Sequence, residues 1–67
     1  MTLFRKPPRG SLTEAHAVMA WLLRWDGWTQ HQIGALFGVN QGSISRILSE
    51  RSFGGSRQIA ERIIRET

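Results

Sequence analysis

The chain has 67 residues, of which 40% are apolar and 21% charged, a composition that suits one small globular domain. Nine Lys and Arg residues against five Asp and Glu give a formal net charge of +4, and this excess favours a polyanionic partner. With no cysteine, the chain has neither a disulfide framework nor a thiolate zinc site, and its longest apolar run, residues 17–23, is too short to span a bilayer.

We expect residues 1–10 to form an extended, flexible, basic arm. Arg5, Lys6 and Arg9 surround two prolines, and a proline restricts the residue before it to extended conformations. No hydrophobic segment of a signal peptide precedes these prolines, so we expect a cytoplasmic protein with no membrane partner. The alternative interpretation of the arm is an ordinary solvated tail.

A first helix is predicted from Leu12 to about Trp25. Ser11 and Glu14 have the spacing of a capping box, in which two side chains each bond a backbone N–H group of the first turn. Gly27 ends the helix, because glycine suits the left-handed position that follows many helices. At helical spacing, four apolar residues share a face that we expect to be buried, with two tryptophans on its flank: Ala15, Val18, Met19 and Leu22, then Trp21 and Trp25.

Two short helices follow, separated by a turn at Gly38. Thr29 and Gln32 form a second capping box, and the helix that they start runs to about Phe37. Asn40 is the expected N-cap of a third helix, over about 41–50. The third helix carries an apolar side and an opposite, solvent-facing polar side: Ile44, Ile47 and Leu48 on the first, and Gln41, Gly42, Ser45, Arg46 and Ser49 on the second.

A last helix is predicted over about 57–65. Pairs of opposite charge four residues apart, Arg57 with Glu61 and Arg62 with Glu66, support it. No alternation typical of strands occurs, so residues 11–67 are expected to form an all-α fold, a small helical bundle of about four helices. Four apolar residues on one side of the last helix either complete the core or form a twofold interface: Ile59, Ala60, Ile63 and Ile64.

The segment 30–49 carries a recognisable pattern of glycines and apolar residues. Gly38 stands between its helices, Gly34 lies inside the first of them, and the string FGVNQGSISRIL spans the turn and the second. This segment resembles the helix-turn-helix of bacterial and phage repressors, site-specific recombinases and transposases. The motif buries apolar residues at the positions that here hold Ile33, Phe37, Val39, Ile44 and Ile47.

The close approach of the two helices explains the glycine at position 34. Helices that cross through a short turn must come near each other, so we expect a large side chain at Gly34 to push them apart. The motif favours a small residue there, usually alanine. We expect the glycine to allow tighter packing against the first helix.

The resemblance implies that the helix at about 41–50, in a motif core of about 29–50, enters the major groove of double-stranded DNA. It implies base contacts from that helix, with Gln41 suited to adenine and Arg46 to guanine or to phosphate: Gln41, Gly42, Ser45 and Arg46. It implies contacts to the DNA backbone from Thr29, Gln30, His31, Ser43, Ser49 and Arg51. The arm resembles those that enter an adjacent minor groove, here through Arg5, Lys6 and Arg9.

The function implied is that of a sequence-specific transcriptional regulator, a bacterial or phage repressor that acts at the nucleoid and binds a palindromic operator as a homodimer. The alternatives are an accessory DNA-binding factor of recombination or packaging, similar to an excisionase or a terminase subunit, a protein-binding module of the same fold, or a fragment of a larger DNA-acting enzyme. No nucleophile elbow, paired acids or phosphate-binding glycine loop occurs, so we expect no enzyme, no cofactor and no metal. An exposed tryptophan would indicate a dimer contact.

Overall fold

The computed structural model describes residues 12–67, which contain no strand and form four helices: α1 (Glu14–Trp25), α2 (Gln30–Phe37), α3 (Gln41–Leu48) and α4 (Ser56–Glu66). The expected all-α bundle is confirmed. The predicted arm, with Arg5, Lys6 and Arg9, lies outside the described residues. Within the described part of the chain, no helix has the length and apolar character needed to cross a membrane.

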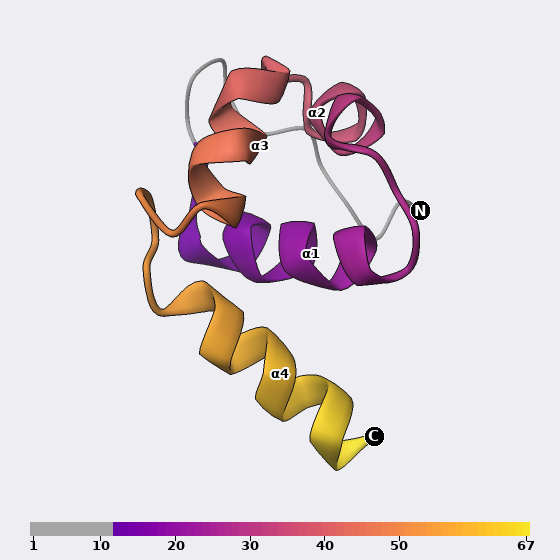
Figure 1. The fold of residues 1–67 in the computed structure, drawn as a ribbon, viewed down its shortest axis with the longest axis vertical. Helices are drawn as coiled ribbons and strands as arrows, with labels where there is room; N and C mark the ends of the chain where they lie inside the picture. Colours follow the sequence, from indigo (N-terminus) through magenta and orange to yellow (C-terminus); the bar gives the residue numbers. More distant parts are fainter. Residues whose placement is uncertain (1–11) are drawn as a thin grey trace.

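The helix α1 lies between the other three. α2 and α3 pack on each other and on one side of α1, and α4 packs on its other side (Figure 1). In Figure 1, α2 is seen nearly along its axis whereas α1 runs across the view, so these two helices cross steeply. This arrangement places α3 and α4 on opposite sides of the central helix.

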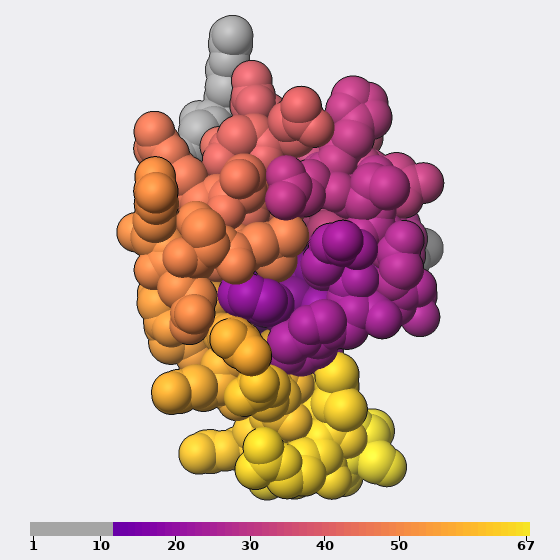
Figure 2. All heavy atoms as spheres, viewed as in Figure 1, coloured from indigo at the N-terminus to yellow at the C-terminus, as the bar shows by residue number. Residues whose placement is uncertain are grey.

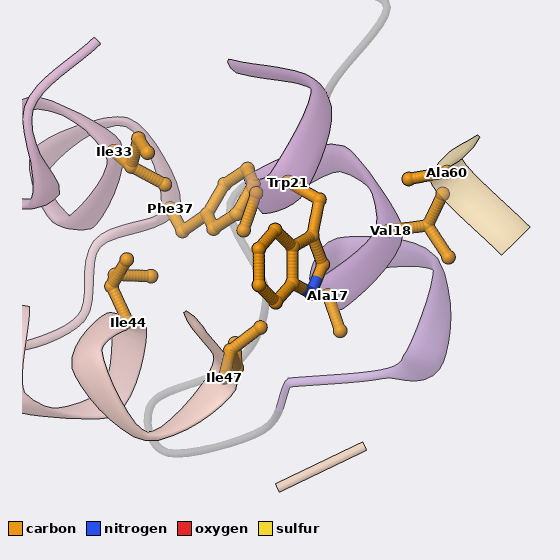
Figure 3. Packing of buried hydrophobic residues seen from close by; sticks show 9 residues of the cluster. Ala17, Val18, Trp21, Ile33, Phe37, Ile44, Ile47 and Ala60 are labelled. Atoms are coloured by element: carbon orange, nitrogen blue, oxygen red, sulfur yellow. The ribbon is translucent and has the colours of Figure 1, made fainter. Parts of the chain in front are cut away.

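The core is a cluster of side chains contributed by all four helices (Figure 3). As the resemblance implies, four of its apolar positions on α2 and α3 are at most 1% exposed: Ile33, Phe37, Ile44 and Ile47. Val39, in the turn between these helices, is half-buried. Ala60 of α4 closes the cluster on the far side of α1.

The buried face of α1 differs in part from the expectation. Val18 is buried as predicted, but Ala15 is exposed, and Met19 and Leu22 are only half-buried. Because helices cover α1 on two sides, it buries a wider set of positions than one amphipathic stripe: Ala17, Val18, Ala20 and Trp21. Trp21, expected on a flank, therefore belongs to the core.

The caps of the helices explain where each one begins. α1 starts later than predicted, because Thr13 rather than Ser11 is its N-cap. The Thr13 hydroxyl accepts a hydrogen bond from the His16 backbone N–H at 3.4 Å, and His16 Nδ1 accepts one from the Thr13 N–H at 3.2 Å. A histidine thus takes the part that the predicted box gave to Glu14. The other expected caps are confirmed: the Thr29 box with Gln32, Gly38 at φ 73°, and Asn40.

The attachment of α4 to α1 depends on small residues and on one tryptophan. Ser56 and Ala60 are fully buried, and Trp21 Nε1 donates a hydrogen bond to Ser56 Oγ at 3.1 Å. The Arg57 guanidinium lies over the Trp21 ring, 5.7 Å from its centroid, and forms the expected ion pair with Glu61 at 3.3 Å. Of the four apolar residues of α4, only Ala60 completes the core.

Candidate nucleic-acid interface

The exposed side of α3 brings together the residues that the sequence predicts to contact DNA bases and one, Ser49, that it predicts to contact the DNA backbone. On a helix, residues four apart lie on the same side, so the predicted positions follow one stripe while Ile44 and Ile47 are buried on the other. All the stripe's members are exposed to solvent: Gln41, Gly42, Ser45, Arg46 and Ser49.

The turn between α2 and α3 is closely packed at Gly34. A Cβ atom at this position would lie 2.9 Å from the Val39 carbonyl oxygen and 3.4 Å from the Gln41 backbone nitrogen. The expectation that a larger side chain would force the two helices apart is therefore confirmed. The expected partner was wrong, because the nearest atoms belong to the turn and to the start of α3, and not to α1.

Polar groups at the start of α3 divide between structure and solvent. Asn40 Oδ1 accepts a hydrogen bond from the Gly42 backbone N–H at 2.7 Å, so this side chain is held as the cap. The exposed Gln41 amide forms no hydrogen bond with the described residues. Gln41 is thus the group at this end of α3 that is able to donate and accept at once with an outside partner.

The first turn of α2 lies beside the start of α3, because His31 lines one hollow with Asn40 and Gln41. Thr29 is engaged as the cap: its oxygen accepts from the Gln32 N–H at 3.1 Å, and its own N–H donates to Gln32 Oε1 at 2.9 Å. The backbone N–H groups of Gln30 and His31 belong to the first helical turn, which offers them no carbonyl partner. These two N–H groups can therefore donate hydrogen bonds to an anion. The only donor that Thr29 has left for an outside partner is its hydroxyl proton.

One edge of α3 lines a hollow together with residues from two other parts of the chain. Ser43 and Arg46 line a hollow with Ser52, Phe53 and Leu12, the first described residue of the chain. Leu12 therefore lies at the edge of α3. Sequence reasoning missed this proximity, because nothing in the local pattern relates Leu12 to position 46.

The Ser49 hydroxyl is used inside the fold, since it donates a hydrogen bond to the Arg46 carbonyl oxygen at 3.1 Å. A phosphate oxygen accepts hydrogen bonds and donates none, so the predicted contact from Ser49 would require this bond to break. Here Ser49 acts as the C-cap of α3, which ends at Leu48 rather than at the predicted residue 50.

The loop after α3 holds two non-glycine residues in the left-handed region, Glu50 at φ 63° and Phe53 at φ 52°. Glu50 occupies the position after the cap, where the Arg51 N–H bonds the Arg46 carbonyl at 2.9 Å and the Glu50 N–H bonds that of Ile47 at 3.0 Å. Glycine is the residue usually found in this helix ending. Because glutamate stands at this position, the sequence offered no indication of a left-handed helix ending here.

The segment of α2 and α3 differs in charge from α1 and α4, which both contain acidic residues. Residues 29–49 contain no Asp or Glu. The exposed Arg46 and Arg51 form no ion pair with the described residues, whereas Arg57 pairs with Glu50 at 3.8 Å and with Glu61. The two free guanidinium groups leave this surface open to an anionic partner.

Comparisons of the chain with models of protein families, with curated proteins and with solved structures found no match. Among residues 12–67, no group of histidine and acidic side chains has the arrangement of a metal site.

Proposed function

We propose that α2, the turn at 38–40 and α3 act as a helix-turn-helix that binds double-stranded DNA with α3 in the major groove. The observation that carries the proposal is the polar stripe of α3, fully exposed on a helix whose other side is buried, in a segment without acidic residues. We further propose a homodimer on a palindromic operator, with transcriptional regulation as its role.

The dimensions of α3 support this mode of binding. Its eight residues make a helix of about 12 Å, and the major groove of B-DNA is about 12 Å wide and admits one helix. Gln41 has both an amide N–H and a carbonyl oxygen, the pair that reads the N6 and N7 edge of adenine. Arg46, one turn further along, has the planar fork that matches guanine O6 and N7 or a phosphate.

The groups around α3 suit contacts with phosphates. The free N–H groups of Gln30 and His31 stand at the positive end of the α2 dipole, next to Gln41. Ser43, in the first turn of α3, and Arg51, beyond its end, extend the same kind of contact along the helix. Contacts of this type fix the register of a protein on the duplex without reading its sequence.

The arm is attached in a position from which it can reach DNA. Leu12 lines the hollow beside Arg46, and a chain extends by at most about 3.6 Å per residue. Three residues of chain therefore span at most roughly 11 Å, the reach from Leu12 to Arg9, and seven span at most roughly 25 Å, the reach to Arg5. Half a turn of the duplex, about 17 Å, separates a major groove from the neighbouring minor groove. We propose that the arm enters that minor groove through Arg5, Lys6 and Arg9.

The experiment that tests the function is selection of bound duplexes from a random DNA pool, with affinities then measured at two salt concentrations. A twofold-symmetric consensus, with half-sites about 34 Å apart, is the expected result. Weak binding that is blind to sequence and falls steeply with salt would overturn the operator-binding role and favour the accessory role. Absence of binding at low salt would overturn DNA binding altogether.

The arm is tested by the salt dependence of binding to the selected site. Arg5→Ala and Lys6→Ala each remove a phosphate contact, so each should lower the slope of log K against log salt by about one unit. Arg62→Ala, which removes a charge on the opposite side of α1, is the control and should leave the slope for a single half-site unchanged. Unaltered slopes for both arm variants would show that the arm is an ordinary tail.

A further inference from the structure

The helix α4 buries its smallest side chains and exposes its largest apolar ones. Ser56 and Ala60 are fully buried against α1, whereas Ile59, Ile63 and Ile64 are 39%, 44% and 52% exposed. A helix whose apolar side is left in water in this way is usually covered by a partner.

The most exposed large apolar side chains lie on α4 and at the end of α1. In the part of the chain that the structure describes, the large apolar side chains with most of this exposure are the three isoleucines and Trp25, at the end of α1. Trp25 and Ile64 line one hollow together with Arg57, Glu61 and Arg65. Figure 2 shows the second half of α4 as a lobe that stands out from the remainder.

The two halves of α4 have different surroundings. By helical spacing, Ser56, Ala60, Ile63 and Ile64 lie along one side of the helix. The first half of this side is buried against α1, while the second half, with Ile64 beside the last turn of α1, remains exposed (Figure 1). We name the surface formed by residues 61–66 and Trp25 the α4 overhang.

We propose that a second copy of this chain covers the α4 overhang, with the two α4 helices antiparallel and Ile63 of each level with the partner's Ile64. The charges on α4 carry this choice of occupant. With a rise of 1.5 Å per residue, this register places Glu61 within about 1.5 Å, along the axis, of the partner's Arg65. It places Glu66 equally near the level of the partner's Arg62.

Both flanks of the overhang are matched in this register. Glu61 and Arg65 are four residues apart and share one side of α4, and Arg62 and Glu66 share the other. A twofold axis across an antiparallel pair sets each flank against the same flank of the partner, so every glutamate meets an arginine. A parallel pair would set each flank against the opposite flank of the partner, where Glu61 also comes near an arginine, so exchange of the Arg62 and Glu66 charges separates the two orientations.

The charges that this dimer pairs are available in the single chain. Arg62, Arg65 and Glu66 are exposed and form no ion pair with the described residues, and Glu61 contacts only Arg57. The overhang carries both signs of charge, which suits contact with itself better than contact with a polyanion such as DNA.

The inference rests on the proposed function for its purpose, since a twofold dimer presents two copies of α3 to one operator. Because α1 lies between α3 and α4, pairing through the overhang leaves the polar stripe of α3 uncovered. The surface itself is defined without DNA and is tested without it.

The test is sedimentation equilibrium of the full chain without DNA, from about 1 µM to about 1 mM. Wild type should pass from monomer to dimer in this range, and Ile63→Glu and Ile64→Glu should weaken the dimer by at least about 100-fold, because each buries an unpaired charge. Ile59→Glu is the matched control: its level falls beyond the end of the partner's α4, so the dissociation constant should change less than about threefold. Circular dichroism must show that each variant keeps its helices.

A charge exchange tests the register. Arg62→Glu and Glu66→Arg should each weaken the dimer about threefold to tenfold, and an equimolar mixture should regain the wild-type affinity as a heterodimer. A wild type that stays monomeric at about 1 mM, a dimer that is insensitive to Ile63→Glu, or a mixture that regains nothing would overturn the proposal. If the wild type stays monomeric but still binds a half-site, only the dimer proposal is overturned. If it forms the dimer but binds no DNA, only the proposed function is overturned.

Discussion

The α2–α3 pair buries its large apolar side chains, whereas α4 exposes them. In the pair, Phe37 and Ile44 are at most 1% exposed, and polar residues form the surface of α3. In α4, the isoleucines form the surface, and Ser56 and Ala60 make the contact with the core. Both regions are short helices of the same small protein, so the difference lies in which side of each helix the fold covers.

This difference separates what holds the fold together from what is left for partners. The pair supplies the largest fully buried apolar side chains and has side-chain caps at both helix starts, from Thr29 and Asn40. α4 starts without a side-chain cap and is held chiefly through Trp21. The two open surfaces differ in chemistry, since that of α3 is polar with unpaired arginines, and that of α4 is apolar with charges of both signs.

The contrast predicts very different costs for two truncations of large apolar side chains. Phe37→Ala should lower the free energy of unfolding by about 3–5 kcal/mol, because it empties a fully buried site that also touches the His16 ring. Ile64→Ala should cost less than about 0.5 kcal/mol when the protein is monomeric. Urea denaturation at low protein concentration measures both. Similar costs for the two variants would contradict the division between the regions.

A second prediction concerns two glycines, one in each region. Gly34→Ala should destabilise the fold by about 1–3 kcal/mol, although alanine inside a helix normally gains about 0.5–1 kcal/mol over glycine. The new Cβ would lie 2.9 Å from the Val39 carbonyl, and a backbone atom cannot rotate away. Gly55→Ala, before α4, is the control, because a Cβ there meets nothing within 4 Å. Thermal unfolding should separate the two variants, and a stabilising Gly34→Ala would refute the close approach.

The third prediction compares two exposed glutamines. Gln41→Ala should cost about 1–3 kcal/mol on the selected site and relax the preference at one base pair, because its amide has no internal partner and reads a base edge. Gln58→Ala, the same change on α4, should leave both affinity and preference unchanged. Fluorescence anisotropy with a panel of single-base variants of the site measures this. An equal loss on every sequence would assign Gln41 to the backbone instead.

Much of the fold followed from local signals in the sequence. The Thr29 box, the left-handed Gly38 and the Asn40 cap were predicted because each depends on side chains within three residues of the helix end. The buried residues of α2 and α3 were predicted because one side of each helix is covered. The buried face of α1 was predicted less well, because other helices cover α1 on two sides. A single stripe of apolar residues at helical spacing predicts burial on only one side.

The candidate site could be placed from sequence, but its hydrogen bonds could not. The exposure of Gln41 and Arg46 follows from the burial of Ile44. The hydrogen bond from Ser49 to the Arg46 carbonyl depends on the rotamer of the Ser49 side chain. The proximity of Leu12 to Arg46 depends on how α1 crosses α3. Both are properties of tertiary packing, which no local pattern records.

The smallest expected effect lies in the loop that joins the two regions. Glu50→Gly should stabilise the fold by about 0.5–1 kcal/mol, because φ 63° strains a residue with a Cβ atom and suits glycine. The change also removes the ion pair of Glu50 with Arg57, which at 3.8 Å between exposed groups contributes little. Glu50→Ala loses the same ion pair and keeps the Cβ, so the difference between the two variants isolates the backbone. We expect the glycine variant to have the higher thermal midpoint of the two, and the reverse order would mean that the left-handed backbone of residue 50 imposes no strain that glycine relieves.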